Sequence, residues 1–147
     1  MNSSNCLQGK VAFVQGGSRG IGAAIVKRLA QDGASVAFTY VSSSIESEKL
    51  VKEIVEQGGK ALAIKANSLE AIEIRNAIKE TVTAFGGLDI IVNNAGVLIW
   101  DSIENLTLDD WERTINTNVR SVFIASQETA IHMNDNPAIK GLIELIE

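Results

Sequence analysis

The segment 16–22 reads GGSRGIG and has four glycines in seven residues. It follows the apolar run 11–14 and precedes a stretch in which Ile21, Ile25 and Leu29 recur at four-residue spacing. This order predicts a strand, a tight turn and a helix. Such a turn places backbone N–H groups at the start of a helix, where the helix dipole favours negative charge. The segment is therefore predicted to bind a phosphate or pyrophosphate.

A second polar segment, Asn93-Asn94-Ala95-Gly96, follows the apolar run 88–92. Asparagines are common turn formers, and the glycines at 16–22 could likewise serve a turn that needs only positive φ. Both segments, however, end predicted buried strands, and the carboxyl ends of parallel strands meet at one edge of a sheet. We expect the two segments to line one ligand crevice.

The segments that must position these residues alternate between strand and helix. Apolar runs predict strands at 10–15, 34–40, 60–65 and 88–92. Helical periodicity predicts helices from the glycine turn to about 32, at 45–57, at 69–85 and from 107 to about 133. The asparagines at 116 and 118 mark the point where the last helix could break. Glu48 and Lys52 can pair at i,i+4.

This alternation predicts an α/β fold, a Rossmann-type doubly wound parallel sheet with helices on both faces. Right-handed crossovers make 3-2-1-4 the expected strand order. The order reverses between the first and the fourth strand, and sheets of this kind bind ligands at that point.

The composition argues against several classes of function. The 147-residue chain has a net charge of −5 and no basic stretch longer than Lys27-Arg28, so neither nucleic acid nor a membrane is an expected partner. No apolar run approaches a membrane span, and the N-terminus does not resemble a secretory signal. The chain has one cysteine, Cys6, and one histidine, His132, so no disulfide and no metal site are expected. A cytoplasmic location is predicted.

The glycine turn and Asn93-Asn94-Ala95-Gly96, each after its strand, together resemble the short-chain dehydrogenase/reductase family. The run 88–92 and Asn118 within 115–119 are also similar to that family. The likeness covers residues 10 to about 133, which correspond to the N-terminal part of the family's fold. It is strongest to the 3-oxoacyl-acyl-carrier-protein reductase-like group. Residues 1–147 are therefore interpreted as a single NAD(P)-binding Rossmann domain.

The resemblance implies an oxidoreductase that transfers hydride to or from a carbonyl or alcohol substrate. It assigns cofactor binding to Gly16, Ser18, Arg19, Gly20, Ile21, Tyr40, Ser42, Ser43, Asn67, Ser68, Asn93, Ala95 and Gly96. In this assignment Asn67 and Ser68 meet the adenine, and Asn93 braces the backbone and the cofactor ribose. Asn118 has a catalytic role, because it carries a water that relays protons. Gln15 and Asn67 depart from the family, which usually has Thr and Asp there.

The residues after the second strand choose between the two nicotinamide cofactors. A carboxylate there would bind the ribose 2′-OH of NADH and repel the 2′-phosphate of NADPH. The segment 39–43 has no carboxylate, whereas Arg19 adds a cation and Ser42 and Ser43 add hydroxyls. The sequence therefore predicts NADPH over NADH.

The family's chemistry also needs a serine and a Tyr-x-x-x-Lys pair, in which the lysine lowers the pKa of the tyrosine. The only tyrosine is Tyr40, and Lys140 follows Asn136 rather than a tyrosine at that spacing. Residues 134–147 are read as an aberrant C-terminal tail, in which 141–147 suits a strand or a short helix. The fold is thus expected to be truncated after the long helix and inactive alone.

Two other interpretations stay open, a non-catalytic NADP-binding subunit or regulatory fragment and a nonfunctional gene remnant. The substrate, a small carbonyl or alcohol compound, is not specified by these residues. In the family the long helix packs against a partner subunit, so the resemblance implies a homo-oligomer formed through the helix expected at 107–133.

Overall fold

The computed structural model describes residues 5–133 and shows one four-stranded parallel sheet. Its strands are β1 (Val11–Gln15), β2 (Ser35–Tyr40), β3 (Lys60–Lys65) and β4 (Ile90–Asn93). Their order is β3-β2-β1-β4, and each neighbouring pair is parallel. The predicted α/β class and strand order are confirmed.

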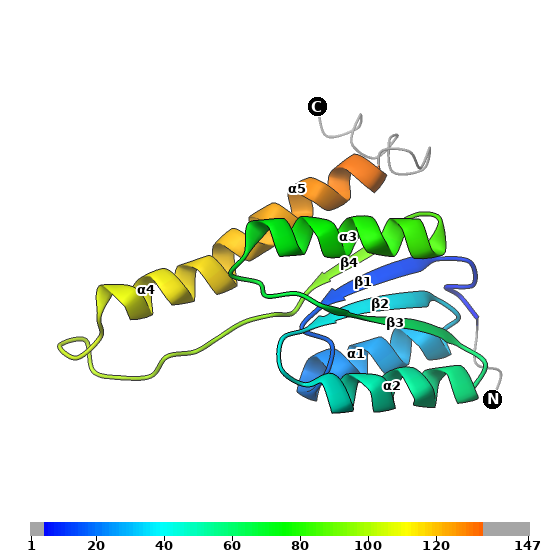
Figure 1. Cartoon of the computed structure of the whole chain (residues 1–147), viewed down its shortest axis with the longest axis horizontal. Helices are drawn as coiled ribbons and strands as arrows, with labels where there is room; N and C mark the ends of the chain where they lie inside the picture. Colours follow the sequence, from blue (N-terminus) through cyan, green and yellow to red (C-terminus); the bar gives the residue numbers. More distant parts are fainter. Residues whose placement is uncertain (1–4, 134–147) are drawn as a thin grey trace.

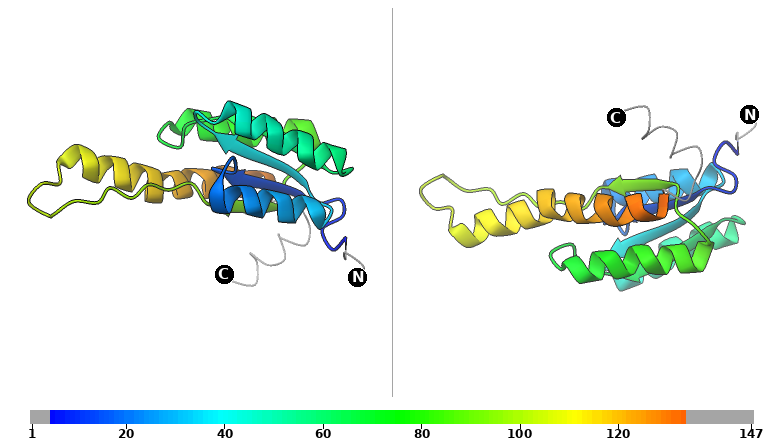
Figure 2. Two further views of the ribbon diagram at one scale, coloured as in Figure 1. Left: turned by 90° about the horizontal axis from the view of Figure 1, so that it is seen from below. Right: turned by 90° about the horizontal axis from the view of Figure 1, so that it is seen from above.

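Helices cover both faces of this sheet. They are α1 (Gly20–Gln31), α2 (Ser44–Glu56), α3 (Ala71–Phe85), α4 (Leu108–Ile115), the π-helix η1 (Asn116–Arg120) and α5 (Ser121–Met133). α1 and α2 lie on one face and α3 and α5 on the other, which makes three layers (Figure 1). α4, η1 and α5 form one rod, in which α5 lies against the sheet and α4 extends beyond its edge (Figure 2).

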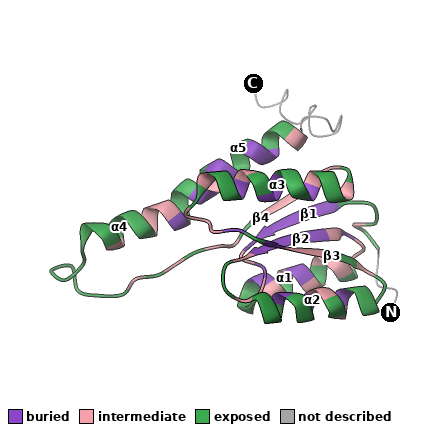
Figure 3. Cartoon of the chain, in the orientation of Figure 1, coloured by how far each residue is buried: buried purple, intermediate pink, exposed green. Residues whose placement is uncertain are grey.

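The core lies on both faces of β1, every residue of which is buried. Ala12 packs in a cluster with Val26 of α1, whereas Phe13 packs in a cluster with Ile78 of α3 and Ala125 of α5. This alternation explains why the strand needs a continuous apolar sequence rather than an alternating one. Burial is concentrated in the strands and on the inward faces of the helices (Figure 3).

The rod has a π-helical turn in the region where a break was predicted. η1 begins at Asn116 and ends at Arg120, and π-helical turns are rare features that occur often at functional sites. At the outer end of the rod, Thr107 and Asp110 form a capping box. Thr107 Oγ1 accepts from Asp110 N at 3.1 Å, and Thr107 N donates to Asp110 Oδ2 at 3.0 Å.

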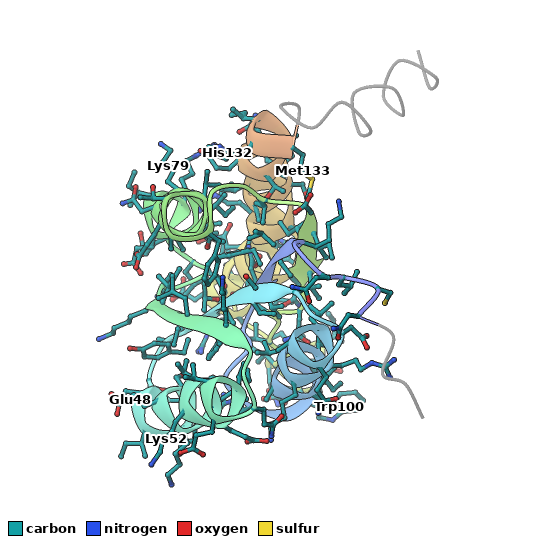
Figure 4. All side chains as sticks on the ribbon, turned by 90° about the vertical axis from the view of Figure 1, so that its right-hand side faces the viewer. Glu48, Lys52, Lys79, Trp100, His132 and Met133 are labelled. Atoms are coloured by element: carbon teal, nitrogen blue, oxygen red, sulfur yellow. The ribbon has the colours of Figure 1, made fainter. Side chains whose placement is uncertain are left out.

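The ion pair that the spacing allows between Glu48 and Lys52 is not the one that forms. Lys52 Nζ lies 3.8 Å from Glu56 Oε1, so Lys52 pairs with the acid one turn after it rather than with Glu48. Both Glu48 and Lys52 are exposed on the outer surface of α2 (Figure 4), where ion pairs contribute little. The tail, with Asn136 and Lys140, lies outside the described residues.

None of the helices within residues 5–133 has the length and apolar character that a membrane span requires.

Candidate functional site

The glycine turn joins β1 to α1 and is held against the end of β2. Gly16 N donates to Thr39 Oγ1 at 2.9 Å, and Gly17 N donates to the Thr39 carbonyl at 3.0 Å. Gly16 and Gly20 have φ of 68° and 54°, values that non-glycine residues rarely adopt. The positive φ that a tight turn requires is therefore present at both positions.

The turn is also too tightly packed for side chains. A Cβ added at Gly22 would lie 2.1 Å from the Gly16 carbonyl oxygen, and one at Gly17 would lie 2.4 Å from Phe38 Cβ. By contrast, a Cβ at Gly20 would meet no atom within 4 Å, so open space borders the backbone there. A ligand can therefore approach the main chain closely at this point.

The start of α1 has free donors for an anion. The first helical hydrogen bond runs from Ala23 N to the Arg19 carbonyl at 3.2 Å, so the N–H groups of residues 20–22 precede the helical ladder. Arg19, the N-cap, makes no side-chain capping bond, and the first turn contains no acidic residue. Together with the helix dipole, these groups favour a phosphate.

Asn94 connects the end of β4 to the glycine turn. Its Nδ2 donates to the carbonyl oxygens of Gln15 (3.2 Å) and Gly16 (2.9 Å). The bracing expected of Asn93 is therefore made by Asn94. Asn93 is the last residue of β4, and its Nδ2 lies 3.4 Å from Ser126 Oγ on α5.

Asn118 of η1 holds the chain just beyond this segment. Its Oδ1 accepts from Val97 N at 2.8 Å, and its Nδ2 donates to the Val97 carbonyl at 2.7 Å. A Cβ added at Gly96 would lie 3.3 Å from the same Oδ1. Asn118 thus fixes the loop through both of its amide atoms, while its role in proton relay stays a prediction.

The turn and the loop open onto a cleft of about 480 Å³ at the carboxyl edge of the sheet. Its lining includes these residues predicted from the sequence: Gly16, Ser18, Arg19, Ile21, Tyr40, Ser42, Ser43, Asn67, Ser68, Ala95 and Gly96. Gly20, Asn93 and Asn118 are predicted residues that do not line it. Gly22 and Asn94, which belong to the two segments predicted to line the crevice, line it as well. The residues that the sequence reasoning missed are Thr39, Val41, Ala66, Leu69, Val97, Arg113 and Thr117.

The spacing of Arg113 and Thr117 relates these two residues to each other, although it does not place them at the cleft. They are four residues apart in the helix that carries Asn118, and such residues share a helical face. Ile21 lines the cleft, as its assignment to cofactor binding requires, and its 75% exposed surface does not join the apolar stripe of Ile25 and Leu29.

Asn67 uses its side chain to shape the loop after β3. Its Oδ1 accepts from Leu69 N at 3.0 Å, and its own N–H donates to Glu73 Oε2 at 2.7 Å. The side-chain NH₂ group is the remaining donor, and it can bond to the edge of a base.

The cleft is positively charged although the chain is acidic. Its lining contains Arg19 and Arg113 and no Asp or Glu. Neither guanidinium has a carboxylate of residues 5–133 within 4.0 Å. Both are therefore available to an anionic or aromatic ligand. Within the same residues, no group of three or more His, Cys, Asp or Glu side chains could hold a metal ion.

A second cleft, of about 520 Å³, lies at the amino ends of the strands between the C-terminal ends of α1 and α2. It is slightly larger, but its lining contains none of the predicted site residues. Helix C-termini disfavour anions. The smaller cleft is therefore the better candidate for a nucleotide.

Comparisons with known proteins agree with this geometry. The family model described as short chain dehydrogenase matches residues 10–143. An uncharacterized oxidoreductase of Methylorubrum extorquens is 39% identical over 140 residues, which are 95% of this chain and 56% of the relative. The chain thus spans about half the length of the curated relatives it matches.

Solved structures show the same relationship. A short-chain dehydrogenase/reductase from Serratia marcescens is 60% identical with a TM-score of 0.85, over 88% of this chain and 53% of that one. A short-chain dehydrogenase from Burkholderia cenocepacia in complex with NADP is 54% identical with a TM-score of 0.84. The match covers 86% of this chain and 51% of that chain. The chain belongs to the short-chain dehydrogenase/reductase family of oxidoreductases.

Proposed function

We propose that this chain binds NADP(H) in the cleft at the carboxyl edge of the sheet and orients it for hydride transfer to or from a carbonyl or alcohol. The observation that carries the proposal is the junction at Asn94. One side chain joins the glycine turn to the loop that follows β4, so hydrogen bonds link the two halves of the cleft directly.

The residues present fit a dinucleotide. The N–H groups of residues 20–22, the hydroxyl of Ser18 and the open backbone at Gly20 suit a pyrophosphate. Asn67 and Ser68 suit the adenine, and Ala95 and Gly96 leave room for the nicotinamide riboside. The nicotinamide would supply or accept the hydride, and the loop held by Asn94 and Asn118 would fix its position.

NADPH is the proposed cofactor rather than NADH. Arg19, Ser42 and Ser43 all line the cleft on the side of α1 and α2, and no carboxylate lines it. This combination favours a 2′-phosphate, because a guanidinium and hydroxyls donate to phosphate oxygens. The related structure from Burkholderia cenocepacia contains NADP, which supports the same choice.

Proton transfer needs groups that these 147 residues lack. The single tyrosine, Tyr40, ends β2 and lines the part of the cleft beside Val41 and Ser42. We propose that the chain alone binds cofactor but does not turn over substrate. The same observation favours the second candidate function, that of a non-catalytic NADP-binding subunit or regulatory fragment.

Two further proposals concern the cellular location and the oligomeric state of the protein. We place it in a reducing cytoplasm, where the exposed thiol of Cys6 would stay free. We also propose a homo-oligomer through the rod, because Val119, Phe123 and Ile131 expose more than half of their surfaces. Exposed apolar surface of this kind is typical of an interface.

Calorimetric titration of the chain with NADPH and NADH tests the cofactor proposal. We expect NADPH to bind about tenfold more tightly, a difference of about 1.4 kcal/mol. Arg19→Ala should remove most of that difference. NADH binding as tightly as NADPH would contradict the preference, and no binding of either would contradict the function. Steady ketone reduction by the pure chain would contradict the claim of inactivity.

A further inference from the structure

Arg113 lies on α4 and lines the cleft, although neither the glycine turn nor the loop after β4 contains it. Thr117, one helical turn further along the rod, lines the same cleft. Because α3 and α5 pack side by side, this part of the rod lies beside the loop that leads into α3. Arg113 therefore lines the cleft from the rod, whereas Arg19 comes from the start of α1 and Ser42 from the loop before α2.

The position of Arg113 is fixed at both ends of its helix. At the outer end, the capping box of Thr107 and Asp110 closes the first turn of α4. At the inner end, α4 continues into η1, where Asn118 makes two hydrogen bonds with the Val97 backbone. The backbone beneath Arg113 thus cannot move away from the cleft without breaking the contacts of Asn118.

The guanidinium of Arg113 forms no close ion pair within the described part of the chain. No carboxylate of residues 5–133 lies within 4.0 Å of it, and the nearby Asp110 is engaged by Thr107. The planar guanidinium of arginine stacks on aromatic faces as well as pairing with phosphates. Whether Arg113 stacks on an aromatic ring or pairs with a phosphate depends on which part of a bound dinucleotide lies next to its guanidinium.

We propose that Arg113 stacks its guanidinium on the adenine ring of the bound dinucleotide. This rests on the proposed function, in which Asn67 and Ser68, in the loop that leads into α3, receive the adenine. The ribose 2′-phosphate is assigned to Arg19, Ser42 and Ser43, which line the cleft at the starts of α1 and α2. Arg113 is thus a binding residue for the adenine moiety, whether or not a 2′-phosphate is present.

Calorimetric titration with three probes tests this assignment. The probes are NADPH, 5′-AMP, which has adenine but no 2′-phosphate, and reduced nicotinamide mononucleotide, which has no adenine. Arg113→Ala should weaken NADPH and 5′-AMP binding by about fivefold each and leave the mononucleotide unchanged. Arg113→Lys keeps the positive charge but lacks the planar guanidinium, so its affinity for NADPH and 5′-AMP should stay close to that of Arg113→Ala.

Arg120→Ala is the matched control, because Arg120 is an exposed arginine of η1 that does not line the cleft. It should bind all three probes like the wild type. Equal 5′-AMP affinities of Arg113→Ala and wild type would overturn the proposal. So would a loss confined to NADPH that Arg113→Lys restores, since that indicates a phosphate contact. If the wild-type chain binds no NADPH, the proposed function itself fails.

Discussion

The side-chain amide of Asn118 pairs with both backbone groups of Val97, at 2.8 and 2.7 Å. This contact joins the π-helical turn of the rod to the loop that lines the cleft, although the two residues are 21 positions apart. It makes the position of the loop depend on the rod. Both groups of the amide are needed, one as acceptor and one as donor.

Asn118→Ala should therefore loosen the loop and weaken cofactor binding. Hydrogen exchange at the Val97 N–H should become faster, and NADPH affinity should fall by up to about thirtyfold, because two hydrogen bonds of about 1 kcal/mol each are lost. Exchange measured by mass spectrometry over the loop checks this. Unchanged protection of residues 95–98 would show that the loop is held by other contacts.

Gly22→Ala should disrupt the turn. The added Cβ would lie 2.1 Å from the Gly16 carbonyl oxygen, which forces the backbone to move, so we expect a loss of about 1–3 kcal/mol in the free energy of unfolding and no measurable NADPH binding. Gly87→Ala is the control, because its Cβ would meet no atom within 4 Å. Urea unfolding of both variants gives the comparison. A Gly22 variant as stable as the control would disprove the steric account.

Ser42→Asp should reverse the choice of cofactor. A carboxylate at the end of β2 repels a 2′-phosphate and accepts from a ribose 2′-OH, so NADPH affinity should fall and NADH affinity rise, each by about tenfold. Ser44→Asp adds the same charge outside the cleft lining and should alter neither affinity greatly. If the Ser42 variant still prefers NADPH, Ser42 does not contact the 2′-phosphate.

Glu128 makes the stability of the chain depend on pH. Burial raises its pKa, but the hydrogen bond from Arg75, at 2.8 Å, acts with the charge of Lys79 and with His132, whose Nε2 lies 3.4 Å from Glu128 Oε1, to hold the pKa below its ordinary value of 4.5. Lys79 of α3 and His132 of α5 lie on neighbouring helices beside it (Figure 4). A lowered carboxyl pKa stabilises the folded state above pH 4.5, and this contribution is lost as pH falls through the folded value.

Glu128→Gln should therefore reduce the free energy of unfolding by about 1–3 kcal/mol at pH 7, and by much less near pH 3. Urea unfolding at the two pH values measures this. Glu56→Gln, which removes an exposed partner of Lys52, should change stability by less than about 0.5 kcal/mol at either pH. A Glu128 effect that is equal at both pH values would exclude the ionised carboxyl as its source.

Much of the fold and of the cleft could be predicted from local patterns. The strands of continuous apolar sequence and the glycine turn determine the sheet and the ligand edge, because buried parallel strands and tight turns impose strong local constraints. The choice between Asn93 and Asn94 could not be predicted. It depends on where β4 ends, since successive side chains of a strand point to opposite faces and Asn93 faces α5.

The place of Arg113 in the cleft could not be predicted from the sequence for a different reason. It reaches the cleft only because α4 continues through η1 past the edge of the sheet, an arrangement that arises from tertiary packing of α5 against α3. The pairing of Lys52 with Glu56 could not be predicted from the sequence either. Glu48 and Glu56 each stand four residues from Lys52, so the spacing alone allows either ion pair.

The most direct test of the central claim is the mapping of backbone amide shifts by NMR as NADPH is added to the chain. We predict that the largest changes fall on residues 16–22 and 94–97, with smaller ones at 66–69. Gly58 and Gly59, which line the second cleft, should not shift. Shifts concentrated at those two glycines, or no shifts at 16–22 at saturating NADPH, would contradict the assignment of the cofactor to the cleft at the carboxyl edge.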